Sequence, residues 1–254
     1  MTTAATRTIA AKPTTAQTNI GADFSTVDLH RAAALILGPH GRAAPLVDRA
    51  VTATEHERAG LVSRQVRAYR LTVLACRDRL DGLAPSDLWR HARDAERWWV
   101  DPDYVIDVAS FTARLQSPGE LDCALAGLPD VDRVTVVLRD AIGLTLCECE
   151  TITRAPTEVL LTRLMRGRRT LLHALSTRPY LGRDTPTGLD AGCAMTRTIA
   201  GSPEDAPGDS IRSAVDSHCR TCSRCDSLVS GLTALTQALA THEPTPAPHT
   251  IPRC

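Results

Sequence analysis

The sequence predicts an all-α protein: two small helical domains, the second a winged-helix-like helix-turn-helix, followed by a small helical metal-binding domain. Three observations predict this fold class. Apolar residues recur at the three- and four-residue spacing of helices in three separate stretches. Aromatic residues make up only 3% of the 254 residues, so the cores must be built from Leu, Val, Ala and Ile, which suits small helical domains. Histidine and cysteine residues gather near the C-terminus at the spacing of metal ligands.

Composition narrows the function classes. The 29 acidic and 29 basic residues argue against a protein that coats nucleic acid, although one basic face is compatible with this balance. No run of about 18 apolar residues occurs and the N-terminus lacks the apolar core of a secretory signal, so we expect a cytoplasmic protein without a membrane span. Nine cysteines without an export signal favour thiols and metal ligands over a disulfide framework. No nucleophile–base pair, phosphate-binding loop or open metal site stands out, so an enzyme is not expected.

The first domain is expected at residues 26–80. It follows a Thr- and Ala-rich segment, residues 1–25, that is predicted to be disordered, with an organelle transit peptide as the alternative. Residues 38–41, Gly-Pro-His-Gly, separate two of its helices. A later helix has a buried face at helical spacing, formed by Val62, Val66, Tyr69, Val73 and Cys76. Residues 81–118 are expected to form a linker that holds five of the chain's eight aromatic residues. These are expected to pack against the neighbouring cores, with stacking on bases as the alternative.

The second domain is expected at residues 119–178 and contains three helices. Gly143 ends the first of them, and Thr145 can cap the next. The break before the third helix is Arg154–Pro156, because the residue before a proline leaves the helical region. The third helix begins at Thr157. Its apolar stripe consists of Leu160, Leu164, Gly167, Leu171 and Leu175.

Positive charge concentrates around this third helix. Residues 151–178 contain one acid, Glu158, and have a local charge of +5. The six arginines responsible are Arg154, Arg163, Arg166, Arg168, Arg169 and Arg178. A short helix, a tight turn and a basic second helix make a helix-turn-helix, whose second helix would lie in the major groove of DNA. The alternative is an amphipathic surface helix of a bundle, whose arginines only solvate it.

A family pattern runs through the same stretch. Its residues are Leu128-Pro129, Arg133, Leu138, Gly143-Leu144-Thr145, Glu148, Arg163-Leu164, Arg166-Gly167-Arg168 and Leu171. This pattern resembles the C-terminal helix-turn-helix (region four) of extracytoplasmic-function (ECF) sigma factors of the sigma-70 family. With that resemblance, we expect contacts to DNA from Thr157, Glu158, Thr162, Arg163, Arg166 and Arg169. The sequence departs from the family at Glu150, Arg154, Val159 and Leu161, which leaves fewer polar side chains to read base edges.

The first domain resembles sigma region two more weakly. In that family the region binds RNA polymerase and melts the promoter. Its acidic helix would fall at residues 43–50, where most of the acids are missing and Pro45 interrupts the pattern. The resemblance implies a face for the opened promoter strand that consists of Arg67, Tyr69, Arg70, Arg77 and Arg79. The alternative is an ordinary basic surface with a half-buried Tyr69.

A metal site is predicted in the third domain, residues 191–240. His218, Cys222 and Cys225 follow the pattern H-x3-C-x2-C, which brings the His and the first Cys to one helix face and adds the second Cys one turn later. Cys193, 25 residues before His218, can complete the tetrahedral Cys3His set of a structural zinc site. Zinc would supply folding energy to a segment rich in Gly and Pro. The alternative is a set of free or redox-coupled thiols.

The ligand spacing resembles the zinc-binding domain of anti-sigma factors, over residues 192–239. Zinc-bound thiolates can be oxidised with loss of the metal, so the predicted zinc is structural and open to redox control. Residues 179–190, rich in Pro, Gly and Thr, are expected to be a linker. Residues 241–254 are expected to be a Pro-rich disordered tail.

Together the two resemblances imply a sigma-type transcription initiation factor that recruits RNA polymerase core to promoter DNA. Its fused C-terminal zinc domain would contact the sigma-like domains within the same chain and regulate them. One alternative is a helix-turn-helix regulator that acts without polymerase, which the missing acids of residues 43–50 favour. The other is a zinc or thiol sensor or adaptor that binds partner proteins, which Glu150, Val159 and Leu161 favour.

Overall fold

Every regular element of the described part of the chain is a helix, which confirms the predicted all-α fold class. The computed structural model describes residues 25–38, 41–56, 62–81, 106–176, 191–200 and 208–245. In chain order the helices are α1 Thr26–Leu37, α2 Ala44–His56, α3 Arg64–Leu80, α5 Val108–Leu115, α6 Glu120–Ala126, α7 Asp130–Val136, α8 Leu146–Thr153, α9 Thr157–Leu175, α10 Ala191–Ala200, α11 Gly208–Cys219 and α12 Ser223–Thr241. Within these ranges, none of the helices combines the length and apolar content needed to cross a bilayer.

Several predicted segments fall outside the described residues. These are residues 1–24 of the first tail, the linker at 179–190, residues 246–254 of the second tail and four of the five linker aromatics. The fifth, Phe111, lies on α5 and is fully buried, in agreement with the prediction that linker aromatics pack against the cores. Helix α5 therefore occupies part of the predicted linker.

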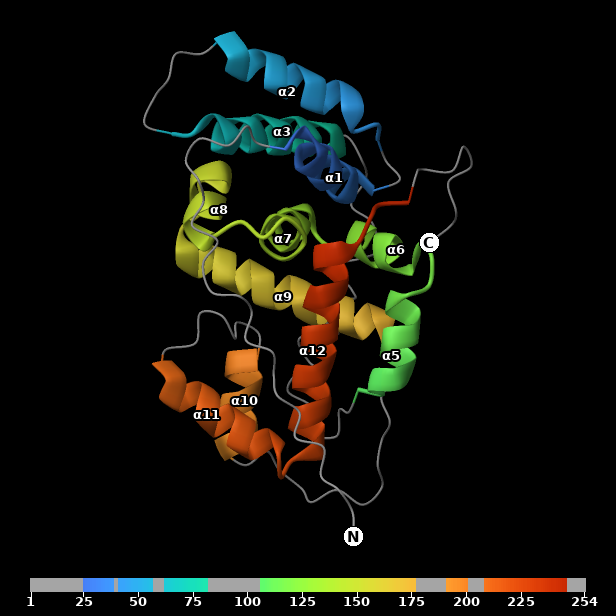
Figure 1. The fold of residues 1–254 in the computed structure, drawn as a ribbon, viewed down its shortest axis with the longest axis vertical. Coiled ribbons are helices and arrows are strands. Elements are labelled where there is room, and N and C mark those ends of the chain that lie inside the picture. The colour runs from blue at the N-terminus through green and yellow to red at the C-terminus, as the bar shows by residue number, and fades with distance from the viewer. Residues whose placement is uncertain are drawn as a thin grey trace.

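Helices α1, α2 and α3 lie together at one end of the molecule (Figure 1). Helix α1 ends at Leu37 because Gly38 has a φ of 55°, in the left-handed region that favours glycine. Pro45 does not interrupt α2, since it stands in the first turn, where a proline displaces no hydrogen bond. Of the five residues expected on the buried face of α3, four are buried. Val62 is the exception: it precedes the Ser63 cap and is 37% exposed.

Helix α7 runs through the middle of the molecule and continues into a π-helical turn, Val137–Ala141. Its Arg133 is buried and donates hydrogen bonds to three backbone carbonyls. The acceptors are Ile36 of α1 at 2.9 Å, Ala126 of α6 at 2.6 Å and Leu128 at 2.9 Å. One guanidinium thus joins the ends of α1 and α6 to the start of α7.

Helix α12 crosses α9 and extends from α10 and α11 to α1 (Figure 1). Its leucines are buried in the same core as those of α1, α7 and α9, so one core extends across the predicted domain boundaries. The α12 residues in this core are Leu228, Leu232, Leu235 and Leu239. Gly231 permits the close approach, because a Cβ there would lie 2.9 Å from Cδ1 of Ile106 and 3.3 Å from Cδ2 of Leu172.

Two polar residues hold the far end of α12. Arg31 of α1 donates hydrogen bonds to the carbonyls of Leu239, Ala240 and His242 at 2.8–2.9 Å. These carbonyls lie at the C-terminus of α12, where the helix has no N–H donors left for them and where a cation is favoured. On α6, Asp122 pairs with Nε2 of His242 at 2.7 Å. The C-terminus of α12 is therefore anchored to both α1 and α6.

Candidate functional site

The four predicted metal ligands come together in the structure. Cys193 lies on α10, His218 near the end of α11, Cys222 immediately before α12 and Cys225 in its first turn. One ligand atom from each residue lies within 4.8 Å of the others. Sγ of Cys193 is 3.8 Å from Sγ of Cys222 and 3.4 Å from Nε2 of His218.

These distances match the edges of a zinc tetrahedron. Sulfur atoms bound about 2.3 Å from one zinc ion at the tetrahedral angle lie about 3.8 Å apart, and a sulfur and an imidazole nitrogen lie slightly closer. The 3.8 Å between Cys193 and Cys222 fits the first value, and the 3.4 Å between Cys193 and His218 fits the second. Three thiols and one imidazole form a set compatible with zinc, with all four protein positions filled.

The turn between α11 and α12 places three of these ligands. The carbonyl of His218 accepts hydrogen bonds from the N–H groups of Thr221 and Cys222 at 3.0 and 2.9 Å, which ends α11. Cys222 is extended, with φ −117° and ψ 98°, and α12 begins directly after it. Cys225 then returns to the cluster one turn later and is fully buried. The sequence pattern predicts His218 and Cys222 on the face of one helix. In the structure, the residues of the H-x3-C-x2-C pattern instead come together across the turn between α11 and α12.

The thiols of the cluster differ in acidity. Although burial raises the pKa of Cys222, hydrogen bonds led by the one from the backbone N–H of Cys225 outweigh it and lower the pKa below that of an ordinary thiol. Burial, and then the neighbouring Cys222, raise the pKa of Cys225 well above its usual range. A bound cation would deprotonate all three thiols, so metal binding there would release protons.

The remaining cysteines of the described part are not among the four clustered ligands. Burial raises the pKa of Cys149 in α8 to about 12, which makes it an inert core residue. Burial likewise raises the pKa of Cys219 to about 11, and this residue is not among the four clustered ligands. Cys123 in α6 is disulfide-bonded, so the expectation that the cysteines serve as thiols and metal ligands is wrong at this residue.

A second candidate site is the unit formed by α8, a three-residue break and α9. Thr145 and Glu148 form a reciprocal capping box at the start of α8. Arg154 ends α8 in the left-handed conformation, with φ 57° and ψ 28°, and Pro156 precedes α9. Gly167 lets α9 approach α7, because a Cβ there would lie only 2.6 Å from Cγ2 of Val136. The helix bounds and the break agree with the sequence analysis.

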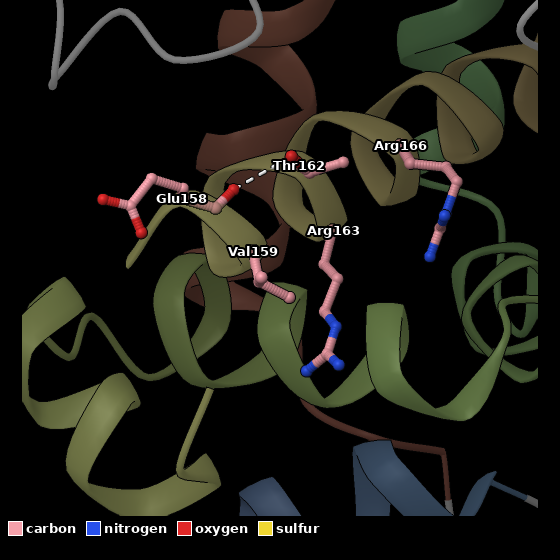
Figure 2. Close-up of a pocket in the computed structure, with 5 residues that line it drawn as sticks. All are labelled: Glu158, Val159, Thr162, Arg163 and Arg166. Atoms are coloured by element: carbon pink, nitrogen blue, oxygen red, sulfur yellow. Dashed lines mark hydrogen bonds between the residues drawn. The ribbon is translucent and has the colours of Figure 1, made fainter. Parts of the chain in front are cut away.

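The residues expected to contact DNA differ in their surroundings (Figure 2). Glu158 and Thr162 are exposed, and the Thr162 hydroxyl bonds only to the Glu158 carbonyl of its own helix. The hydroxyl of Thr157 donates to the Glu150 carboxylate at 3.0 Å. The other three, Arg163, Arg166 and Arg169, are half-buried. An open depression of about 280 Å³ is lined by Glu158, Val159, Thr162, Arg163 and Arg166.

Two arginines of α9 form ion pairs with aspartates that precede α9 in the sequence. Arg166 donates from Nε and Nη2 to the two carboxylate oxygens of Asp132, each at 2.6 Å. Arg168 donates to Asp140 at 2.9 and 2.6 Å, and both side chains are almost fully buried. The local charge of +5 was calculated for residues 151–178 alone and therefore left out Asp132 and Asp140. Because acids from α7 and the π-helical turn neutralise Arg166 and Arg168, the basic face of α9 is smaller than this charge suggested.

Sequence reasoning missed these pairs and the role of Arg133. In the sequence, Arg168 lies on the apolar stripe between Leu164 and Leu171. An arginine at such a position indicates a buried ion pair, because arginine is rarely buried without a partner. Tyr69, expected on the strand-binding face of α3, is 1% exposed and cannot stack on a base. Its burial raises the pKa of its hydroxyl.

Comparisons with known proteins leave the site to be interpreted from its own chemistry. No family model, curated protein or solved structure matches the chain.

Proposed function

We propose that the chain is a DNA-binding transcription initiation factor of the ECF sigma type, regulated by a zinc-binding C-terminal segment that is docked on its DNA-reading body. The observation that carries this proposal is the α8–α9 unit. Helix α9 is braced from α7 and the π-helical turn by Arg166–Asp132 and Arg168–Asp140, while Glu158 and Thr162 at its N-terminal half face solvent. A helix-turn-helix needs this combination, because its second helix enters the major groove by its N-terminal residues.

The proposed polymerase contact lies in α1, α2 and α3. With Tyr69 in the core, the candidate face for the promoter strand is reduced to four of the arginines of α3. These are Arg67, Arg70, Arg77 and Arg79. Such a face would contact phosphates and add little base stacking, so binding to it would depend strongly on salt.

Zinc would act here as a structural ion. Cys193, His218, Cys222 and Cys225 would hold it, and it would fix α10, α11 and the start of α12 to one another. Because α12 shares the core of α9, metal binding would also support the DNA-reading helix. This physical connection supports regulation of the DNA-reading body by the C-terminal segment.

The test compares two aspartate substitutions in the full chain, Thr162→Asp and Thr233→Asp. Both threonines are exposed, and the hydroxyl of each donates to the carbonyl four residues earlier, at 2.9 Å. An added negative charge at Thr162 is expected to abolish promoter binding and transcription with core polymerase, because it would face DNA phosphates. The same charge at Thr233 on α12 is expected to leave both unchanged.

The same experiment separates the proposal from its rivals. Promoter binding that needs no core polymerase would favour a helix-turn-helix regulator that acts alone. If neither DNA nor core polymerase binds, the proposal is wrong, and a second candidate, a metal-dependent protein-binding module, remains. Val159, which is 39% exposed beside the acidic Glu158 at the start of α9, favours that second candidate, because an apolar and acidic surface suits a protein partner better than DNA.

A further inference from the structure

Arg163 does not lie where a base-reading residue of α9 would be expected. Figure 2 shows its side chain directed from α9 toward the neighbouring helices, away from Glu158 and Thr162. There it reaches a second, smaller cavity of about 30 Å³ at the junction of α3, α7, α8 and α9. Arg163 therefore borders both the open depression on α9 and this junction cavity.

The junction cavity brings together two arginines from distant parts of the chain. Arg77 reaches it from α3 and Arg163 from α9, 86 positions apart in sequence numbering. The other lining residues are apolar except for Thr153, whose hydroxyl donates to the carbonyl of Cys149. These other residues are Val73, Leu74, Val131, Val134, Ile152 and Thr153. None of the lining residues is an acid.

Neither guanidinium is neutralised within the described part of the chain. Arg166, Arg168 and Arg114 all form ion pairs with a carboxylate there, but no hydrogen bond or ion pair joins the guanidinium group of Arg77 or of Arg163 to another described residue. Two like charges beside a cavity with apolar walls repel each other, and the repulsion is screened less there than at an open surface. An anion between them would remove this cost.

The geometry points to a phosphate-binding site at the junction cavity, in which Arg77 and Arg163 hold one phosphate group between α3 and α9. Guanidinium groups bind phosphate oxygens in pairs of parallel hydrogen bonds, so arginine suits this ligand better than lysine would. A cavity of about 30 Å³ admits the centres of about two water-sized atoms, which fits the inner oxygens of one phosphate group. If the phosphate belongs to DNA, the inference rests on the proposed function; a free phosphate or nucleotide does not require it.

The test uses the full chain and the variants Arg77→Gln, Arg163→Gln and the double variant, with Arg42→Gln as the control. Arg42 is an exposed arginine between α1 and α2 that neither lines the cavity nor belongs to the proposed face for the promoter strand. One arm measures the thermal midpoint in inorganic phosphate and in chloride at equal ionic strength. The other arm measures the affinity for a labelled duplex without promoter sequence as a function of salt concentration.

Inorganic phosphate is expected to raise the thermal midpoint of the native chain and of Arg42→Gln, but not of the cavity variants. In the DNA arm, each single variant is expected to lower the slope of log affinity against log salt by about one. The double variant is expected to lower it by about one as well, because both arginines hold the same phosphate. An effect in the phosphate arm alone identifies a free phosphate or nucleotide as the ligand, and an effect on the salt slope identifies the DNA backbone.

Two results would overturn the inference. One is that neither arm distinguishes the cavity variants from Arg42→Gln. The other is a loss of about two units of slope in the double variant, which would mean that the arginines hold separate phosphates. Failure of the proposed function would appear differently, as absence of core polymerase binding in the comparison of Thr162→Asp with Thr233→Asp.

Discussion

Replacement of Asp140 by alanine is expected to lower the free energy of unfolding by about 3–5 kcal/mol, because it leaves a buried guanidinium without its counter-charge. The side chains of Arg168 and Asp140 are 1% and 2% exposed. They are joined by hydrogen bonds of 2.9 Å from Nε and 2.6 Å from Nη2. Bulk water therefore does not reach the guanidinium to hydrate the charge left behind. Urea unfolding followed by circular dichroism at neutral pH, with zinc present, measures the loss.

Two matched variants separate the charge from the volume of the side chain. The double replacement of Arg168 by methionine and Asp140 by leucine removes both charges, and it is expected to restore stability to within about 1 kcal/mol of the native chain. Arg166→Gln is expected to cost only about 1–2 kcal/mol, because Arg166 is 30% exposed and Asp132 lies in the first turn of α7, whose backbone N–H groups support its charge. The reasoning would be refuted if Asp140→Ala cost no more than Arg166→Gln.

Three further predictions concern the ends and the middle of α12. Addition of a metal chelator, or the substitution Cys225→Ser, is expected to lower both the amount of bound zinc and the thermal midpoint. A free metal concentration of 100 times the Kd stabilises the folded state by about 2.7 kcal/mol. Calorimetry together with metal analysis measures the loss. Gly231→Ala is expected to cost about 1–3 kcal/mol, since its Cβ would lie 2.9 Å from Cδ1 of Ile106. Ile106→Val in the same chain should recover part of this cost in urea unfolding. Burial raises the pKa of Asp122, but hydrogen bonds led by that from His242 outweigh it, so the pKa lies below its ordinary value. This carboxylate therefore stabilises the fold above the ordinary pKa of aspartate, and the contribution is lost as the pH falls through the lowered pKa, below about 4. Asp122→Asn should remove that acid-side loss from a series of unfolding midpoints against pH, and an unchanged series would contradict the assignment.

Features determined by local chemistry were predictable from the sequence. The break at Arg154–Pro156 follows from the steric effect of a proline on the residue before it. The Thr145 cap follows from side-chain acceptors and backbone N–H donors that lie three residues apart. The cluster around Cys193 also followed from residue type and spacing, although one of its four members is 25 residues away from the next. Each of these predictions depends either on residues a few positions apart in the sequence or on residue types, Cys and His, that are uncommon in the chain.

Features determined by the packing of distant helices were not predictable in this way. Whether Arg168 faces solvent or Asp140 depends on how α9 sits against the π-helical turn, and a charge count along α9 carries no information about that. The same holds for Tyr69, whose spacing allows a buried or a half-buried position. The course of α12 across α9 depends on Gly231, a residue that in an isolated sequence reads only as a weak position in a helix.

The anchoring of α12 by Arg31 has a consequence for how quickly the chain folds. The hydrogen bonds from Arg31 to Leu239 and His242 connect residues 208 and 211 positions apart. Native contacts at such separations raise the contact order, and a higher contact order slows the search for the folded state. Loop closure over this distance costs entropy that grows only with the logarithm of loop length, so the barrier is one of rate more than of final stability. We therefore expect α12 to dock late in folding, after the contacts among α1 to α9, and to leave first when the fold opens locally.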